Sequence, residues 1–242
     1  MYDAQTLLQS IDANKQGFLI LSTVALAFNY LFFIAAALRA RRDRAYAFPL
    51  FLCAFWLAHD VSFLIQFHNW FEVYNHWYLK AFWAGLVVTT ALEMIFLIQF
   101  YRYGKAEVLP KSSQTMWGLY VVGGIVGAFV CWFSLRAALN DPLFAYSFGA
   151  SGFLTPFFCL RLMLDRRDAR GQSLATWIGY IGMQTSWFTA TYLFWAQGFR
   201  SPEYVLLGVV CVTGGIAMAY MIHSAKTRHG VNEVAMGSAA SA

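Results

Sequence analysis

The sequence predicts an all-α, polytopic membrane protein: a bundle of seven transmembrane helices with the N-terminus outside and the C-terminus in the cytoplasm. Two observations predict this class. Of the 242 residues, 60% are hydrophobic and only 12% are charged, and the mean hydropathy is +0.52. A water-soluble domain has too small an interior to bury so much apolar surface, which excludes that class. The basic residues fall mainly in alternate loops, and this distribution predicts the orientation.

The apolar residues fall into seven segments, each about 20 residues long, the length that crosses a hydrocarbon core of about 30 Å as a helix. We expect helices because a membrane span must satisfy all its backbone hydrogen bonds internally. The expected spans are 18–38, 47–67, 81–101, 116–135, 145–164, 174–195 and 204–223. They form one membrane domain over residues 1–225. Residues 226–242 end in Gly, Ser and Ala and are expected to form a disordered cytoplasmic tail.

The fourth span, 116–135, is thinned by four glycines. Small residues allow transmembrane helices to approach one another closely, so we expect this span to pack tightly against a neighbour. The glycines are Gly118, Gly123, Gly124 and Gly127.

Most of the 17 Lys and Arg residues lie in the first, third and fifth connections and in the C-terminal tail. Cytoplasmic loops are enriched in basic residues, which predicts an outside N-terminus. The topology therefore explains the net charge of +5, and no nucleic-acid partner is expected. The expected location is the plasma membrane in a bacterium or the endoplasmic reticulum in a eukaryote. These basic residues are Arg39, Arg41, Arg42, Arg44, Arg102, Lys105, Lys111, Arg161, Arg166, Arg167, Arg170, Lys226 and Arg228.

Two carboxylic acids lie inside expected spans. Asp60 is near the middle of span 47–67, with His59 before it and Trp56 one turn earlier, and Glu93 is inside span 81–101. A carboxylate at such a depth costs about 2.5–3.5 kcal/mol on insertion scales, and such residues usually face a bundle interior or a cavity. Asp60 and Glu93 are therefore the candidate catalytic residues.

Other polar groups lie at similar depths in the membrane. At 1.5 Å per helical residue, Asn29, Asp60 and Glu93 fall within about 8 Å of one another along the membrane normal. Gln184, Trp187 and Thr213 come from similar levels in the last two spans. Adjacent antiparallel helices would bring these groups to one cavity, so the expected substrate-binding residues are Asn29, Trp56, His59, Gln184 and Trp187. The ring of His59 is expected to point about 100° away from Asp60 around the helix.

Two acids in a dry pocket suit proton chemistry, because burial and a neighbouring carboxylate both favour the neutral form of a carboxyl group. A neutral acid can protonate an epoxide, a carbonyl group or an alkene. Aromatic residues, which make up 19% of the chain, can stabilise the resulting carbocation through their ring faces. The structural alternative is that these polar side chains only hydrogen-bond one helix to another.

No metal or other cofactor is expected. His59, His68 and His76 all lie toward the outer side but lack the spacing of a metal motif. The last span contains no lysine before Lys226, which excludes a buried retinal Schiff base. Neither a Gly-x-Gly-x-x-Gly pattern nor a P-loop occurs in the sequence.

Three stretches resemble one known family. The first comprises residues 17–21, Asn-Tyr at 29–30 and Asp-Arg-Ala-Tyr at 43–46. The second is Leu-Cys at 52–53, leading to Asp60. The third is Ala-Tyr-Ser-Phe-Gly-Ala at 145–150, followed by Arg-Gly-Gln-Ser at 170–173 and by Trp177. In this order and spacing they resemble the small seven-span membrane terpene cyclases of fungal meroterpenoid and indole-diterpene pathways, the paxilline-type cyclases.

The resemblance implies a membrane-embedded, acid-catalysed cyclase or isomerase acting on a lipophilic, isoprenoid-derived substrate. Asp60 stands in place of the family's proposed catalytic glutamate, and His59 in place of the preceding tryptophan. The family's second acid lies in the last span, where this chain reads Val-Thr-Gly-Gly-Ile at 212–216. Glu93 is the candidate to replace it.

Two other functions remain open at this point. In a proton-coupled transporter, the two acids would be relay groups. In a non-catalytic lipid-binding protein, they would only contact the lipid. Uptake into proteoliposomes would identify the transporter, and a product with the mass of the substrate but a different retention would identify the enzyme.

Overall fold

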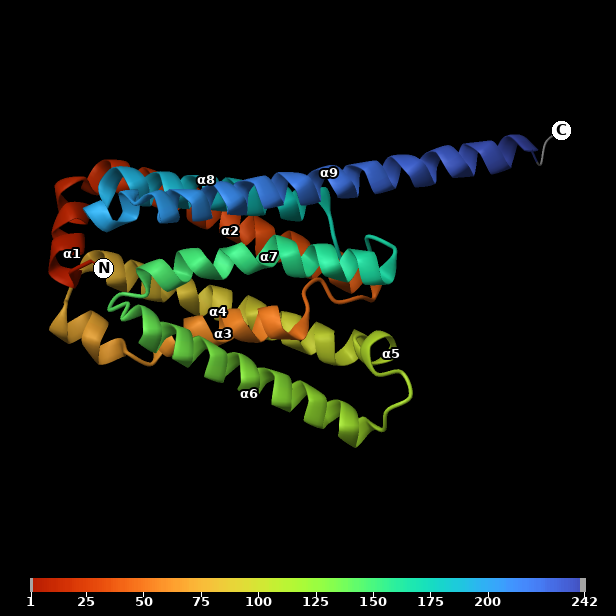
Figure 1. Ribbon diagram of the computed structural model, residues 1–242, viewed down its shortest axis with the longest axis horizontal. Coiled ribbons are helices and arrows are strands. Elements are labelled where there is room, and N and C mark those ends of the chain that lie inside the picture. Colours follow the sequence, from red (N-terminus) through yellow and green to blue (C-terminus); the bar gives the residue numbers. More distant parts are fainter. Residues whose placement is uncertain (1, 240–242) are drawn as a thin grey trace.

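The computed structural model describes the backbone of residues 2–239 and the side chains of residues 2–225, and the described chain is helical with no strands. Figure 1 shows the long helices running side by side as a bundle, with α1 across one end. The elements are α1 (Ala4–Ala13), α2 (Lys15–Asp43), α3 (Leu50–Leu64), the π-helix η1 (Asn69–Val73), α4 (Trp77–Tyr103), α5 (Lys105–Val108), α6 (Gln114–Leu139), α7 (Ala145–Arg166), α8 (Leu174–Phe194), the 3₁₀ helix η2 (Gln197–Arg200) and α9 (Pro202–Ala239). The tail expected at 226–242 lies outside the residues described in full and stays a prediction.

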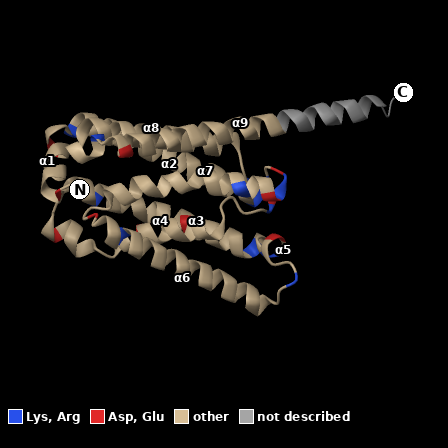
Figure 2. Ribbon diagram, viewed as in Figure 1, with Lys and Arg blue, Asp and Glu red and all other residues tan. Residues whose placement is uncertain are grey.

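Among the described residues, five helices are long and apolar enough to cross a membrane: α2, α4, α6, α7 and α9. Their outer faces expose large apolar side chains, such as Leu119 (62%), Val130 (61%) and Leu206 (62%). Figure 2 shows most charged residues at the two ends of the bundle, with long uncharged stretches of helix between them. These features are those of a membrane protein.

Two of the seven expected spans differ from this pattern. Helix α3 has only 15 residues, beginning after Pro49 and ending at Leu64, and 12 of them are buried. It is therefore a short core helix enclosed by other helices, and span 47–67 was predicted too long. Helix α8 has 21 residues without a charge, but its Thr, Gln, Gly and Trp side chains lower its hydropathy.

The bundle has two groups of helices, with α7 between them (Figure 1). Helices α2, α8 and α9 form one group, and α3, α4 and α6 form the other. Gly179 explains the close approach of α8 to α2, because a Cβ at this position would lie 2.5 Å from the backbone nitrogen of Phe32. At the corresponding contact of α9 with α8, a Cβ on Gly208 would lie 2.7 Å from the ring of Phe188.

The glycines of α6 do not support the tight packing expected of them. A Cβ on Gly118, Gly123 or Gly127 would meet no described atom within 4 Å, and only Gly124 faces a close neighbour, Leu50. The prediction of close packing was therefore wrong at three of the four positions. These three glycines lie on parts of α6 that face away from the bundle.

Helix α1 covers one end of the bundle with Leu7, Leu8 and Ile11, which are buried. Just before α1, the Tyr2 hydroxyl donates a hydrogen bond to Asp141, which precedes α7. The Asp141 carboxylate also accepts hydrogen bonds from backbone N–H groups at the start of α7. These bonds attach the N-terminal segment to the loop between α6 and α7.

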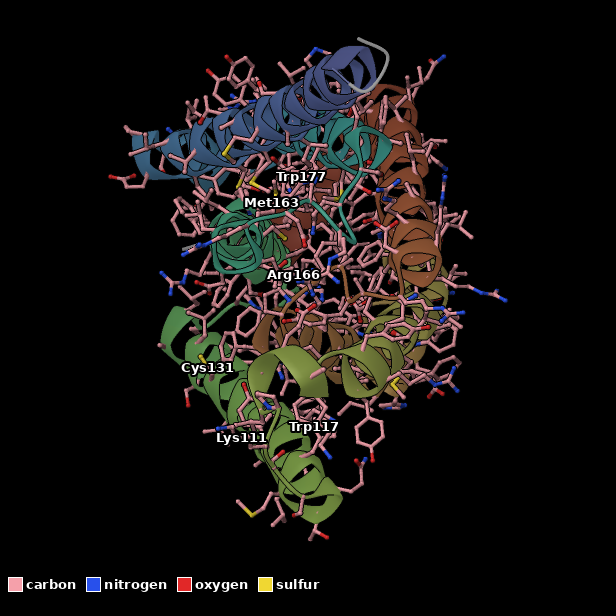
Figure 3. The ribbon with its side chains drawn as sticks, turned by 90° about the vertical axis from the view of Figure 1, so that its right-hand side faces the viewer. Lys111, Trp117, Cys131, Met163, Arg166 and Trp177 are labelled. Carbon is pink, nitrogen blue, oxygen red and sulfur yellow. The ribbon has the colours of Figure 1, made fainter. Side chains whose placement is uncertain are left out.

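Figure 3 views the bundle from its opposite end and labels Trp117, Arg166 and Trp177. These three side chains form hydrogen bonds there. Arg166 on α7 donates to Glu107 of α5 (2.7 Å) and to the carbonyl of Tyr46 (2.9 Å). On α6, Trp117 donates to the carbonyl of Tyr101 (3.0 Å), and on α8, Trp177 donates to Gln172 (2.9 Å). The bonds of Arg166 thus join α7 to α5 and to the segment between α2 and α3, whereas those of Trp117 and Trp177 stay within one group of helices.

Candidate functional site

A cavity of about 200 Å³ lies inside the bundle, between α2, α3, α4, α7 and α8. Most of its wall is apolar and aromatic. All seven residues that the sequence predicted as catalytic or substrate-binding line this one cavity: Asn29, Trp56, His59, Asp60, Glu93, Gln184 and Trp187. The structure thus brings the predicted residues together, while their roles stay predictions.

Helical spacing places the polar groups of α3 and α4 on the cavity wall. Trp56, His59 and Asp60 lie at positions i, i+3 and i+4 of α3, which share one face of a helix. Thr89 and Glu93 have the same i, i+4 relation on α4. Because α3 and α4 pack side by side, these two faces meet. Asp60 lies in the last turn of α3, whereas the sequence placed it in the middle of a longer helix.

Both carboxylate oxygens of Asp60 have hydrogen-bond partners. Nδ1 of His59 lies 2.7 Å from Oδ1, and the hydroxyl of Thr89 donates to Oδ2 at 2.5 Å. The expectation that the His59 ring points away from Asp60 was wrong. The Cα–Cβ bonds of adjacent helical residues do diverge, but rotation of both side chains brings the ring to the carboxylate. Asp60 is 3% exposed, so it is held in place away from water.

Aromatic rings surround His59. Its ring centroid lies 4.9 Å from that of Trp132 on α6 and 5.3 Å from that of Phe148 on α7. Its second nitrogen, Nε2, is buried and has no hydrogen-bond partner in the described part of the chain. When Nδ1 carries the proton and donates a hydrogen bond to Asp60, Nε2 has a free lone pair, on a residue that lines the cavity.

Glu93 lies across from this pair on α4. It is 2% exposed, and within residues 2–225 its Oε2 atom has no hydrogen-bond partner. It lines the same cavity as Asp60. No basic side chain of the described chain forms an ion pair with either Asp60 or Glu93, apart from the contact of His59 with Asp60. Glu93 is therefore a buried acid without a counter-charge, and its neutral form is the one that such a site tolerates.

The α7 wall of the cavity is shaped by Pro156. A proline inside a helix lacks the N–H that would bond to the carbonyl four residues earlier, which here is Gly152. The hydroxyl of Tyr180 on α8 donates to that carbonyl instead (2.8 Å). Gly152 also leaves room for Gln184, since a Cβ there would lie 2.3 Å from Nε2 of that side chain. The indole of Trp56 donates to the next carbonyl toward the N-terminus, that of Ser151 (3.4 Å).

Aromatic rings line the rest of the cavity. Trp187 packs against Phe148 with ring centroids 4.5 Å apart, and against Phe82 at 6.3 Å. Trp56 lies against Phe33 at 5.6 Å. A cation at the centre of the cavity would face several of these rings.

The sequence interpretation missed several residues of the wall. Thr89 has the clearest functional contact, and its position four residues before Glu93 was the available signal. Thr155, next to Pro156, has a buried hydroxyl without a partner in the described part of the chain. Trp77 and Tyr78, at the start of α4, line the end of the cavity near α1. Thr213 was wrongly expected here: it is exposed, and its hydroxyl bonds to Val209 of its own helix.

The described residues include no group of three or more His, Cys, Asp or Glu side chains that would hold a metal ion. Comparisons of the chain with protein-family models, with curated proteins and with solved structures gave no match.

Proposed function

We propose that this protein is a membrane-embedded isomerase or cyclase that uses acid catalysis on a lipophilic, isoprenoid-derived substrate carrying an alkene or an epoxide. One observation supports the proposal most strongly. In a single aromatic cavity, the Oε2 atom of Glu93 and the Nε2 atom of His59 are both buried, and neither has a hydrogen-bond partner in the described part of the chain. A buried proton donor and a buried proton acceptor in one dry pocket are what a redox-neutral rearrangement through a carbocation needs.

Glu93 is the proposed proton donor. Its Oε2 atom is free, whereas both oxygens of Asp60 are already hydrogen-bonded. The role of general acid, which the sequence favoured for Asp60, therefore fits Glu93 better. Asp60 then orients His59 through Nδ1 and leaves Nε2 as the base, and Thr89 holds the second oxygen of Asp60.

The proposed reaction needs no second reactant, because the proton that Glu93 donates is recovered at the end. The Glu93 proton adds to the epoxide oxygen or to an alkene carbon, breaking the C–O or π bond and leaving a carbocation. A second alkene of the substrate attacks this cation, forming a C–C bond and a new cation. Nε2 of His59 removes a proton from the adjacent carbon, and the electron pair of that C–H bond forms the product alkene. Return of this proton from His59 to Glu93 restores the site, and the product has the mass of the substrate.

The aromatic walls suit the intermediate. Trp56, Trp187 and Phe148 face the same space, and a cation above an aromatic ring is stabilised by about 0.5–2 kcal/mol per ring. The cavity contains little polar surface to capture the cation, which favours loss of a proton over addition of water.

The number of membrane spans, the side on which the N-terminus lies and the family of the protein are also part of what we propose. All seven expected segments correspond to helices. We propose a seven-span protein with an outside N-terminus, in which the short α3 crosses while enclosed by the other helices. We further propose that it is of the paxilline-type cyclase kind, with Glu93 taking the place of the acid missing from the last span. Its partners are the bilayer and a bilayer-dissolved substrate.

Product analysis distinguishes this function from its rivals. Membranes containing the protein are incubated with prenylated and epoxidised substrates. The products are separated by chromatography, and their masses are measured by mass spectrometry. The proposal predicts products of unchanged mass and altered retention. A free acid in a bundle also suits proton-coupled transport. Accumulation of an unchanged compound in proteoliposomes, with no new product, would favour that function instead.

A further inference from the structure

The exposed part of the cavity wall is confined to two helices. Of the residues that line the cavity, only Leu19, Thr23 and Leu26 on α2 and Ala81 on α4 are exposed at the protein surface. Every lining residue of α3, α7 and α8 is buried or half-buried. The cavity therefore opens sideways between α2 and α4.

Contacts between α2 and α4 close this opening at both ends. At the end near α1, Phe18 lies edge-on to Tyr78, with ring centroids 5.2 Å apart. At the other end, the hydroxyl of Tyr30 donates to the carbonyl of Gly85 (3.4 Å). From Tyr78 to Gly85, α4 rises about 10 Å, which is the length of the opening along the helices.

The surroundings of the opening are apolar. Leu19 and Leu26 on α2 are each 40% exposed, and Ala81 on α4 is also exposed. All lie within helices that are long and apolar enough to cross a membrane. The opening thus faces the hydrocarbon core of the bilayer and not water. The acidic group lies deeper, since Glu93 is eight residues, or about 12 Å, beyond Gly85 along α4.

We propose that the opening between α2 and α4 is a lateral gate through which an apolar isoprenoid chain passes directly from the bilayer into the cavity. This inference rests on the proposed function for the identity of the chain as a substrate. The chain enters between Leu26 and Ala81, and its leading end reaches Glu93. The substrate class is therefore a lipid dissolved in the membrane that reacts at the end entering first, and not a water-soluble metabolite.

The test measures access without turnover. The full-length protein is reconstituted in phosphatidylcholine vesicles containing farnesol bearing a diazirine at its apolar end, and labelling of α3 and α4 after illumination is located by mass spectrometry. Ala81→Phe places a ring in the opening, and Ala84→Phe is the matched control, because Ala84 is exposed on the same helix and does not line the cavity. Thr23→Phe repeats the test from α2, with Val24→Phe as its control.

Ala81→Phe and Thr23→Phe are expected to lower labelling near Glu93 by about tenfold, because a ring must be displaced before a chain can pass. The two controls are expected to label as the wild type does. Equal labelling in all five proteins would overturn the proposal, as would an absence of labelling near Glu93 in the wild type or an equal loss in the controls. Labelling that depends on Ala81 in a protein without product formation would support the gate while the proposed reaction failed.

Discussion

The hydroxyl of Tyr180 donates a hydrogen bond to the carbonyl oxygen of Gly152 at 2.8 Å. That carbonyl has no helical N–H partner, because the residue four positions later is Pro156. The bond links α8 to the interrupted part of α7, where Gly152 and Thr155 line the cavity. Pro156 therefore interrupts the hydrogen bonds of α7 at the cavity wall, and the hydroxyl of Tyr180 satisfies the carbonyl that this interruption leaves free.

Tyr180→Phe is expected to lower the free energy of unfolding by about 1–3 kcal/mol, because it leaves a buried acceptor without a donor. In a Pro156→Ala background, the backbone N–H of Ala can bond to Gly152, so the same substitution should cost less. Thermal unfolding in detergent of the four proteins of this double-mutant cycle measures the difference. Tyr192→Phe, at an exposed position of α8, is the control. Equal costs in the two backgrounds would contradict the compensation.

Gly179→Ala and Gly127→Ala should have opposite effects on stability. A Cβ on Gly179 meets the backbone of Phe32, which cannot move without separating α2 from α8, and such overpacking costs about 1–3 kcal/mol. Gly127 has open space around its Cα, so Ala there should stabilise α6 by up to about 1 kcal/mol. Unfolding temperatures in one detergent compare the two variants. A stable Gly179→Ala protein would show that the close approach of the two helices is not needed.

Thr89 is a positioning residue for Asp60 in the proposed reaction. Thr89→Val keeps the shape of the side chain but removes the hydroxyl that Oδ2 accepts from. A hydrogen bond to a charged group contributes about 1.5–3 kcal/mol, so kcat is expected to fall by about 10- to 100-fold. Thr89→Ser should restore most of the activity and the wild-type pH profile. A kcat that does not change in Thr89→Val would exclude this role.

The attachment of α1 to α4 is expected to weaken in acid. The indole N–H of Trp77 donates to Asp12 at 2.7 Å and, with the nearby His76 and Lys15, holds the pKa of that carboxyl group below its ordinary value. A pKa lowered by folding means that the contribution to stability is present above about pH 4 and is lost as the pH falls through the lowered pKa.

Hydrogen exchange of α1 measures this attachment. Exchange should accelerate relative to the intrinsic rate as the pH falls below about 4, and Asp12→Asn should remove that step. Asp165→Asn, at an exposed site near the other end of the bundle, is the control. A step that persists in Asp12→Asn would assign the pH dependence to another group.

Hydropathy and helical rise predicted much of this molecule. The seven apolar segments are helices, and the similar depths of Asn29, Asp60 and Glu93 correctly indicated that they share one cavity. The length of a segment and the depth of a residue both depend on distance along the helix axis. That distance can be calculated from residue numbers alone.

Properties that depend on rotation about a helix axis or on side-chain torsions could not be predicted in this way. Thr213 lies at a suitable depth but faces away from the cavity, and His59 turns toward Asp60 by rotation of its side chain. The shortness of α3 depends on enclosure by its neighbours, because a helix buried among others need not be as long as the hydrocarbon core is thick. Helix α1 was not predicted, although the sequence contains a signal for it: Asp3 can cap its N-terminus, and Leu7, Leu8 and Ile11 form one apolar face.

The central claim is that Glu93 and the Asp60–His59 pair perform proton transfer in this cavity, and turnover by single variants tests it most directly. Wild type, Glu93→Gln, Asp60→Asn and the control Asp165→Asn are compared for conversion of one prenylated epoxide, after equal folding has been checked by their unfolding temperatures. The account predicts a loss of about 10²- to 10⁴-fold in Glu93→Gln and Asp60→Asn, the usual contribution of general acid–base catalysis, and no loss in Asp165→Asn. Wild-type conversion by Glu93→Gln would contradict it.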